Sequence, residues 1–160
     1  MADMFFNCYY ITSLNLSNFN TSKVNEFNFM FHNCQSLTSL NLSNFDTSNL
    51  NRTDRMFDGC INLEYINMQN FNEETINSHY VYIFYQVPDN IVICINPNLT
   101  QNTIFPQIKD KACYNIDCSN DWILNQKKII SETNQCVNNC NDTIRDKIIC
   151  RTTSLFSSRK

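Results

Sequence analysis

The chain has 160 residues, 42% of them hydrophobic, and its 15 acidic and 12 basic residues leave a net charge of −3. This length suits one globular domain with an appendage, and the charge balance provides no basic stripe for phosphates, so no nucleic acid partner is expected. Gly59 is the only glycine, which excludes the glycine-rich phosphate loops of most common nucleotide-binding enzymes.

A short pattern recurs along the first half of the chain. Met4-Phe5-Phe6-Asn7-Cys8 aligns with Met30-Phe31-His32-Asn33-Cys34 and again with Met56-Phe57-Asp58-Gly59-Cys60, at a spacing of 26 residues. The positions that follow keep the same register: Leu14, Leu16 and Phe19 match Leu40, Leu42 and Phe45, and then Ile66, Met68 and Phe71. Agreement at this many positions with one spacing predicts a repeat architecture.

Each repeat unit has two parts with different periodicities. From Ser13 to Ser17 apolar and polar residues alternate, as in a half-buried strand. From Val24 to Leu37 the apolar residues follow the stripe of a short helix, and the Thr-Ser pairs at Thr21 and Thr47 are placed to accept the first free N–H groups of such helices. The predicted fold is α/β, a leucine-rich-repeat-like solenoid of 26-residue repeats with a parallel sheet plus short helices.

The pattern M-F-x-x-C-x-x-[LI]-x-x-[LI]-x-[LM]-x-N-F, followed by Asp46-Thr47-Ser48 in the middle unit, resembles the BspA-like leucine-rich repeats from Met4 to about Asn72. The resemblance implies a surface-displayed repeat protein of bacteria or protists that acts in adhesion and protein binding. It also implies an extracellular or cell-surface location. The third unit departs from the pattern, because Glu73-Glu74 replaces the Thr-Ser pair.

Beyond the third unit the pattern decays, as expected where a last repeat must present a polar end or a covering element to water. Residues 76–98 are predicted to form a degenerate capping repeat, in which Pro88-Asp89 make a turn and the apolar run Ile91 to Ile95 adds a strand. The predicted divisions are leucine-rich-type repeats at 1–75, with units near 4–29, 30–55 and 56–75, then this cap, and a cysteine-rich tail at 99–160.

The chain opens inside the repeat pattern, so the first unit is expected to expose Met4, Phe5 and Leu14. No signal peptide is visible in the opening residues, and no window has the roughly 18 consecutive apolar residues of a membrane-spanning helix. Two explanations stay open for the uncapped start. The chain is a fragment whose upstream part is missing, or it self-associates end to end at this edge.

The nine cysteines fall into two groups. Cys8, Cys34 and Cys60 share the repeat period and are expected to stack as free thiols in the core. The others lie in or near a polar tail with too little apolar surface to fold alone, so disulfides and an oxidising compartment are expected. The disulfide candidates are Cys94, Cys113, Cys118, Cys136, Cys140 and Cys150. Their pairing stays open, and a zinc site at Cys113, Cys118, Cys136 and Cys140 is the alternative, although these spacings are longer than those of the usual zinc knuckle.

No residue pattern indicates catalysis, and no cofactor or metal is expected as part of the function. The two histidines, His32 and His79, neither recur in the repeat nor pair with an evident acid, as a catalytic base would. The protein is therefore not expected to be an enzyme.

Instead, the polar strand positions that point away from the core are expected to line one continuous binding face. They are Ser13, Asn15, Ser17, Ser39, Asn41, Ser43, Tyr65, Asn67 and Gln69. The predicted function is the binding of a protein or glycan partner through this face. Two alternatives stay open: a structural stalk that displays the cysteine-rich tail, and an intracellular adaptor stapled by zinc.

Overall fold

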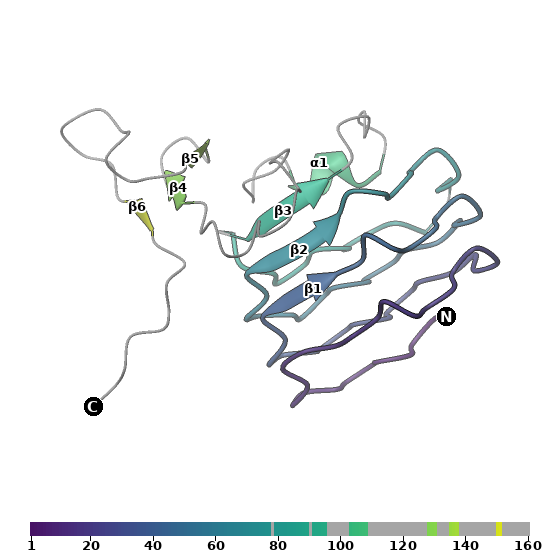
Figure 1. Cartoon of the computed structure of the whole chain (residues 1–160), viewed down its shortest axis with the longest axis horizontal. Coiled ribbons are helices and arrows are strands. Elements are labelled where there is room, and N and C mark those ends of the chain that lie inside the picture. Colours follow the sequence, from purple (N-terminus) through teal and green to yellow (C-terminus); the bar gives the residue numbers. More distant parts are fainter. Residues whose placement is uncertain are drawn as a thin grey trace.

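The computed structural model of the chain describes residues 1–77, 79–89, 91–95, 103–108, 128–130, 135–137 and 150–151. The strands β1 (Ser39–Asn41), β2 (Tyr65–Met68) and β3 (Val92–Ile95) form a parallel sheet in the order β1-β2-β3. Figure 1 shows them side by side, with the short helix α1 (Phe105–Ile108) next to β3. The predicted parallel sheet is confirmed, including the strand expected within Ile91 to Ile95.

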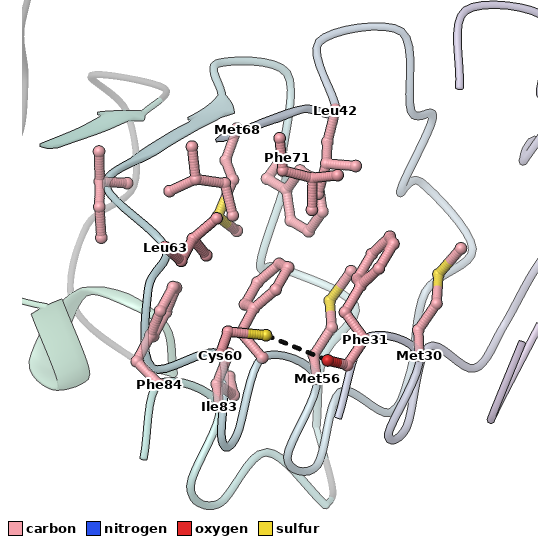
Figure 2. Packing of buried hydrophobic residues seen from close by; sticks show 14 of the residues in the cluster. Met30, Phe31, Leu42, Met56, Cys60, Leu63, Met68, Phe71, Ile83 and Phe84 are labelled. Carbon is pink, nitrogen blue, oxygen red and sulfur yellow. Dashed lines mark hydrogen bonds between the residues drawn. The ribbon is translucent and has the colours of Figure 1, made fainter. Parts of the chain in front are cut away.

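A segment of tight turns precedes each strand segment and lies on the other side of the core, as Figure 2 shows. We call one turn segment with its strand segment a layer. The four layers are residues 1–19, 27–45, 53–71 and 79–95, and backbone hydrogen bonds join each layer to the next. The strand side and the turn side are therefore both built from contacts between residues one repeat apart.

The helices predicted on the turn side are not formed, and this expectation is wrong for the described repeats. Residues 27–34 make consecutive β-turns instead, one of them closed by the Cys34 N–H donating to the Phe31 carbonyl at 3.1 Å. Asn33, the third residue of that turn, has a φ of 57°, as in a type II turn. Alternate N–H groups point to the next layer, as from Phe31 to Met56 at 2.9 Å. In an α-helix the same groups would point along the helix axis and could not join layers.

The threonines expected to cap the helices also join layers. The hydroxyl of buried Thr21 donates to the Asp46 carbonyl at 3.0 Å and accepts from the Asp46 N–H at 2.8 Å. Thr47 makes the same pair of bonds with Asn72, at 3.4 and 2.8 Å. A hydroxyl both donates and accepts, so one side chain satisfies both backbone groups of a residue about one repeat further along the chain.

The segment Ser13–Ser17 is not a strand in the structure, although its leucines point inward as predicted. Leu16 is buried and Leu14 is partly buried against the core. This segment is the outermost on the strand side and has a neighbouring layer along one edge only. The Asn44 side chain donates to the Leu16 carbonyl at 2.9 Å, which occupies a group that a regular sheet ladder would use.

The core contains one phenylalanine from each layer in a continuous stack. The ring centroids of Phe5, Phe31, Phe57 and Phe84 follow one another at 5.4, 5.7 and 5.3 Å. Beside this stack the Cys60 thiol donates to the Phe31 carbonyl at 3.0 Å (Figure 2). Cys8, Cys34 and Cys60 are free, and the last two are buried, so the predicted thiol ladder is confirmed.

The region predicted as a degenerate cap forms the whole fourth layer. Tyr65 of β2 lies opposite Val92 of β3, an offset of 27 residues, whereas Ser39 lies opposite Tyr65 at an offset of 26. The same extra residue brings Phe84 onto Phe57 in the stack. Ile83-Phe84-Tyr85-Gln86-Val87 therefore occupies the place of the earlier M-F-x-x-C pattern.

A segment from the predicted tail closes the fourth layer. Ile104 and Ile108 are buried in the common core. Beside α1, the Glu73 Oε2 atom accepts from the Thr103 N–H at 3.2 Å and from the Ile104 N–H at 2.9 Å. The capping element is thus residues 103–108, held by the glutamate that replaces a threonine in the third unit.

The described part of the remaining tail is a small antiparallel sheet. Its strands are β4 (Lys128–Ile130), β5 (Gln135–Val137) and β6 (Cys150–Arg151), in the order β5-β4-β6.

Candidate binding site

The predicted strand face is open in the first two layers and closed in the third. Ser13, Asn15, Ser17 and Asn41 are exposed, while Ser39, Ser43 and Gln69 are partly buried. Tyr65 and Asn67 are only 6% and 3% exposed, so their predicted solvent exposure is wrong. β2 is paired along both edges and all of its residues are buried, so its polar positions do not reach solvent.

The fold itself uses the asparagines of this face. The Oδ1 atoms of Asn15, Asn41 and Asn67 each accept the N–H two residues further along, at 3.1, 3.0 and 3.0 Å. Such Asx turns end each strand segment in the same way. The repeated asparagine therefore has a local structural role, and the exposed face has fewer free acceptors than the sequence indicates.

Exposed aromatic side chains gather in the first and fourth layers instead. In the first layer Met4, Phe6, Tyr9 and Tyr10 are exposed, whereas Phe5 and Leu14 are partly buried. The predicted exposure is thus confirmed for Met4 alone among the three residues named for this edge. In the fourth layer Val81, Tyr82 and Tyr85 are each about half exposed, and they lie on the turn side.

An open pocket of about 480 Å³ lies on this part of the fourth layer, and we call it the aromatic pocket. It is lined by Tyr80, Val81, Tyr82, Phe84, Tyr85 and Gln107. Its volume is in the range of pockets that bind small ligands or single side chains. The Tyr82 and Tyr85 rings meet edge to face at 5.6 Å. None of the described lining residues is charged.

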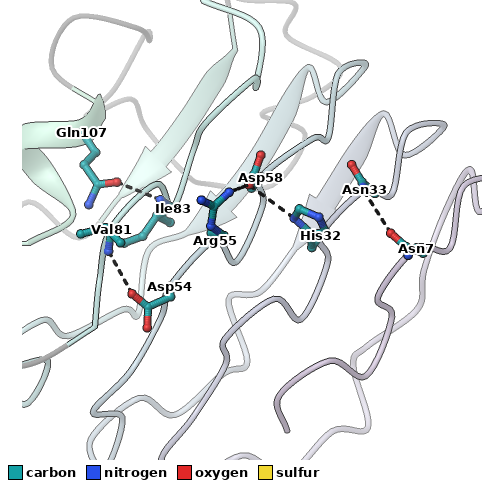
Figure 3. Close-up of polar contacts among 9 residues, drawn as sticks. All are labelled: Asn7, His32, Asn33, Asp54, Arg55, Asp58, Val81, Ile83 and Gln107. Carbon is teal, nitrogen blue, oxygen red and sulfur yellow. Dashed lines mark hydrogen bonds and ion pairs between the residues drawn. The ribbon is translucent and has the colours of Figure 1, made fainter.

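Gln107 holds α1 against the pocket from the capping segment. Its Oε1 atom accepts from the Ile83 N–H at 2.9 Å (Figure 3). Its Nε2 atom donates to the carbonyls of Tyr80 at 2.7 Å and Thr103 at 2.9 Å. Both N–H bonds of the amide are therefore committed to the protein backbone.

A row of ionisable residues lies beside the pocket in the second and third layers. The Arg55 guanidinium carbon is 4.8 Å from the centre of the Tyr82 ring, and its NH1 atom is 2.7 Å from Oδ2 of buried Asp58. His32 Nδ1 lies 3.5 Å from the same oxygen (Figure 3). Arg55 thus balances the charge of a buried carboxylate and holds Tyr82 by a cation–π contact.

Both histidines have an acidic neighbour, which the sequence did not reveal. His32 lies near Asp58, and His79 Nδ1 is 3.7 Å from Oδ2 of Asp54. The expectation that neither pairs with an acid is wrong, because each partner comes from the adjacent layer. Asp54 also accepts the Val81 N–H at 3.3 Å, so it serves the junction between the third and fourth layers.

The aromatic pocket does not follow from a repeat spacing of 26, because the fourth layer is out of register with the repeat. A search at a spacing of 26 compares Met56-Phe57 with Tyr82-Ile83, whereas an offset of 27 aligns them with Ile83-Phe84. Allowing one inserted residue after Asn77 recovers the apolar positions of the pattern. Gln107 carries no such signal, because its role depends on where α1 folds back.

One family comparison matches the chain. A family model described as "Mycoplasma protein of unknown function, DUF285" matches residues 1–90. The chain belongs to the DUF285 family. Among the described lining residues of the aromatic pocket, the matched part includes all except Gln107. No curated protein and no solved structure matches this DUF285 chain.

The remaining predictions concern the tail of this DUF285 chain, and only part of that tail is among the described residues. Cys94 is buried on β3. The side chains of the other five disulfide candidates lie outside the described residues, so the pairing and the alternative zinc site stay predictions. The described residues contain no group of three or more potential metal-ligating side chains. In the same part of the chain, no helix has the length and apolar character needed to span a bilayer.

Proposed function

We propose that this DUF285 chain is a BspA-like leucine-rich-repeat solenoid, secreted or displayed at the cell surface, that binds a protein or glycan partner. The repeat pattern and the parallel, layer-by-layer hydrogen bonding support the solenoid. The resemblance noted in the sequence supports the surface location. A repeat array of this kind has extended surfaces that its own folding does not fill.

The aromatic pocket is the observation that carries the binding proposal. The side chains of Val81, Tyr82 and Tyr85 line this pocket and are each about half exposed to solvent. Clustered exposed aromatic and aliphatic groups are typical of interaction sites, because they release water when a partner covers them. Tyrosine is also enriched among the residues that dominate binding energy at interfaces.

The strand face is a second, weaker candidate surface. Its accessible residues in the first two layers are Ser13, Asn15, Ser17 and Asn41. They are small and polar, and the asparagine oxygens already accept backbone N–H groups. This surface therefore offers hydrogen bonds but little apolar area to bury.

Paired variants of the full chain distinguish binding at the aromatic pocket from binding at the strand face. Binding is measured on an array of oligosaccharides and on an array of extended peptides. We expect Tyr82→Asn with Tyr85→Ala to abolish the strongest signal, and Asn15→Ala with Asn41→Ala to leave it unchanged. If the folded protein binds neither array, or if the pocket variant binds as well as the unmodified chain, the aromatic pocket does not carry the function.

A further inference from the structure

We propose that the aromatic pocket binds a proline-rich segment of a protein partner in the extended polyproline II conformation. This inference rests on the proposed binding function and narrows it from a protein or glycan to one class of ligand. It depends on three properties of the pocket, namely its charge, its supply of hydrogen-bond donors and its rigidity.

The pocket is built for a neutral ligand. Its described lining consists of three tyrosines, a valine, a phenylalanine and a glutamine. Among the described residues, the cation that contacts the lining is Arg55, which lies over the Tyr82 ring and is paired with Asp58 at 2.7 Å. The Arg55 guanidinium would repel a cationic ligand. It would attract an anionic ligand only weakly, because Asp58 already balances the charge of Arg55. A proline-rich segment has neither charge.

The hydrogen-bonding groups of the pocket match a ligand that has acceptors but few donors. The hydroxyls of Tyr80, Tyr82 and Tyr85 make no hydrogen bond with any residue in the described ranges, so they are available. A polyproline II segment has solvated carbonyls and lacks N–H groups at its prolines. Tyrosine hydroxyls lining an aromatic groove can donate to such carbonyls while proline rings pack against the aromatic faces.

A sugar would find few acceptors in the pocket, because the three tyrosine hydroxyls are the only uncommitted side-chain acceptors among the described lining residues. Every sugar hydroxyl is a donor as well as an acceptor, and buried donors must be paired. The described lining contains no carboxylate, and its only amide, Gln107, has its Nε2 atom bound to two carbonyls and its Oε1 atom bound to the Ile83 N–H. The pocket therefore favours a proline-rich peptide over a glycan.

The tyrosines are held in place before any ligand arrives. The Arg55 guanidinium lies over the Tyr82 ring, and the Tyr85 ring meets Tyr82 edge to face. Tyr82 itself has a φ of 58°, which stacking of the fourth layer on the third maintains. A rigid groove and a stiff polyproline II ligand both lose little entropy on association.

Titration calorimetry measures the binding of three probes to the full chain. The probes are a peptide of about ten prolines, which forms a polyproline II helix, a Gly-Ser peptide of equal length, and a neutral linear glucose hexasaccharide. Tyr82→Asn tests the ring while keeping a residue that tolerates positive φ. Tyr85→Phe removes only a hydroxyl, and Tyr10→Ala removes an exposed tyrosine outside the pocket. Circular dichroism of each variant checks that it is folded.

We expect the proline peptide to bind and the other two probes not to bind. Tyr82→Asn should weaken binding at least tenfold, Tyr85→Phe about threefold through one lost hydrogen bond, and Tyr10→Ala not at all. Binding of the hexasaccharide with loss in Tyr82→Asn would overturn the proline-rich ligand but keep the proposed function. Equal binding of the proline peptide and the Gly-Ser peptide would also overturn it. So would binding of the proline peptide to folded Tyr82→Asn with the affinity of the unmodified chain. If folded protein binds no probe here and neither array above, both proposals fail.

Discussion

The Oε2 atom of Glu73 lies 2.9 Å from the Thr103 hydroxyl and 2.9 Å from the Ile104 N–H. Glu73 follows Thr21 and Thr47 at the repeat spacing. A threonine there reaches the backbone of the next layer, whereas the longer glutamate reaches the capping segment. One substitution thus replaces the bonds of a threonine bridge with bonds that attach the cap.

Replacing Glu73 with alanine should detach this cap. The change leaves the N–H groups of Thr103 and Ile104 buried without an acceptor, so we expect a loss of about 2–4 kcal/mol in the free energy of unfolding. Urea unfolding measures the loss. Glu74 is exposed, so Glu74→Ala is the matched control, with a change within about 0.5 kcal/mol. Equal effects of the two variants would contradict the role assigned to Glu73.

Two buried threonines should respond in opposite ways to the same substitution. Thr47 bonds both backbone groups of Asn72, so Thr47→Val should lower the free energy of unfolding by about 1–3 kcal/mol. The hydroxyl of Thr53 is buried without a hydrogen-bond partner, so Thr53→Val should be neutral or stabilising. Thermal unfolding of both variants checks this contrast. The assignment of Thr47 as a bridge between layers is wrong if the two variants lose equal stability.

Gly59 should not tolerate a side chain. Its φ is 78°, and a Cβ atom there would clash with the Oδ1 atom of Asn33 in the preceding layer. We expect Gly59→Ala to cost about 2 kcal/mol, partly from the backbone conformation and partly from the clash. Adding Asn33→Gly removes the clash and should recover part of the loss, which a double-mutant cycle measures. No recovery would mean that backbone strain alone requires this glycine.

The buried thiols should make the fold weaker at alkaline pH. Burial raises the pKa of Cys34 from its ordinary value of 9.0 to about 11 and raises that of Cys60 further. Above pH 9 these thiols ionise in the unfolded chain but stay protonated in the folded one. Their contribution to stability is therefore complete below pH 9 and is lost as pH rises toward 11.

Unfolding experiments between pH 8 and 11 test this dependence. The free energy of unfolding should fall with pH, and Cys34→Ala should make that fall shallower than in the unmodified chain. Native-state alkylation at pH 8 provides a second measurement, with Cys8, the partly exposed thiol, reacting before Cys34 and Cys60. A pH slope unchanged by Cys34→Ala would show that other groups cause the alkaline loss.

Periodicity predicted the core but misjudged the backbone on the turn side. Phe27, Met30, Phe31, Cys34 and Leu37 are all fully buried, as the apolar stripe required. A stripe of that spacing is also met by consecutive β-turns whose N–H groups bond the next layer. Which backbone forms depends on the presence of an adjacent layer, and that is a long-range property.

The candidate site shows the same division. The outward polar residues of the strand segments were predictable, but the burial of Tyr65 and Asn67 was not, because it arises only in the folded chain. The aromatic pocket needed two separate segments to meet, the displaced fourth layer and Gln107 from α1, and Arg55 from the third layer contacts one of its tyrosines. Only Tyr80 to Tyr85 are contiguous in the sequence.

The sequence by itself determined the repeat, the inward apolar positions, the parallel pairing of β1 to β3 and the free thiol ladder. These follow because identical neighbours at one spacing can stack in only one register. Only the tertiary structure decided that turns replace helices, that the fourth layer shifts by one residue, and that tyrosines gather beside α1. Each of those outcomes depends on hydrogen bonds between layers. The residues that make these bonds are far apart in the sequence and come together only in the folded chain.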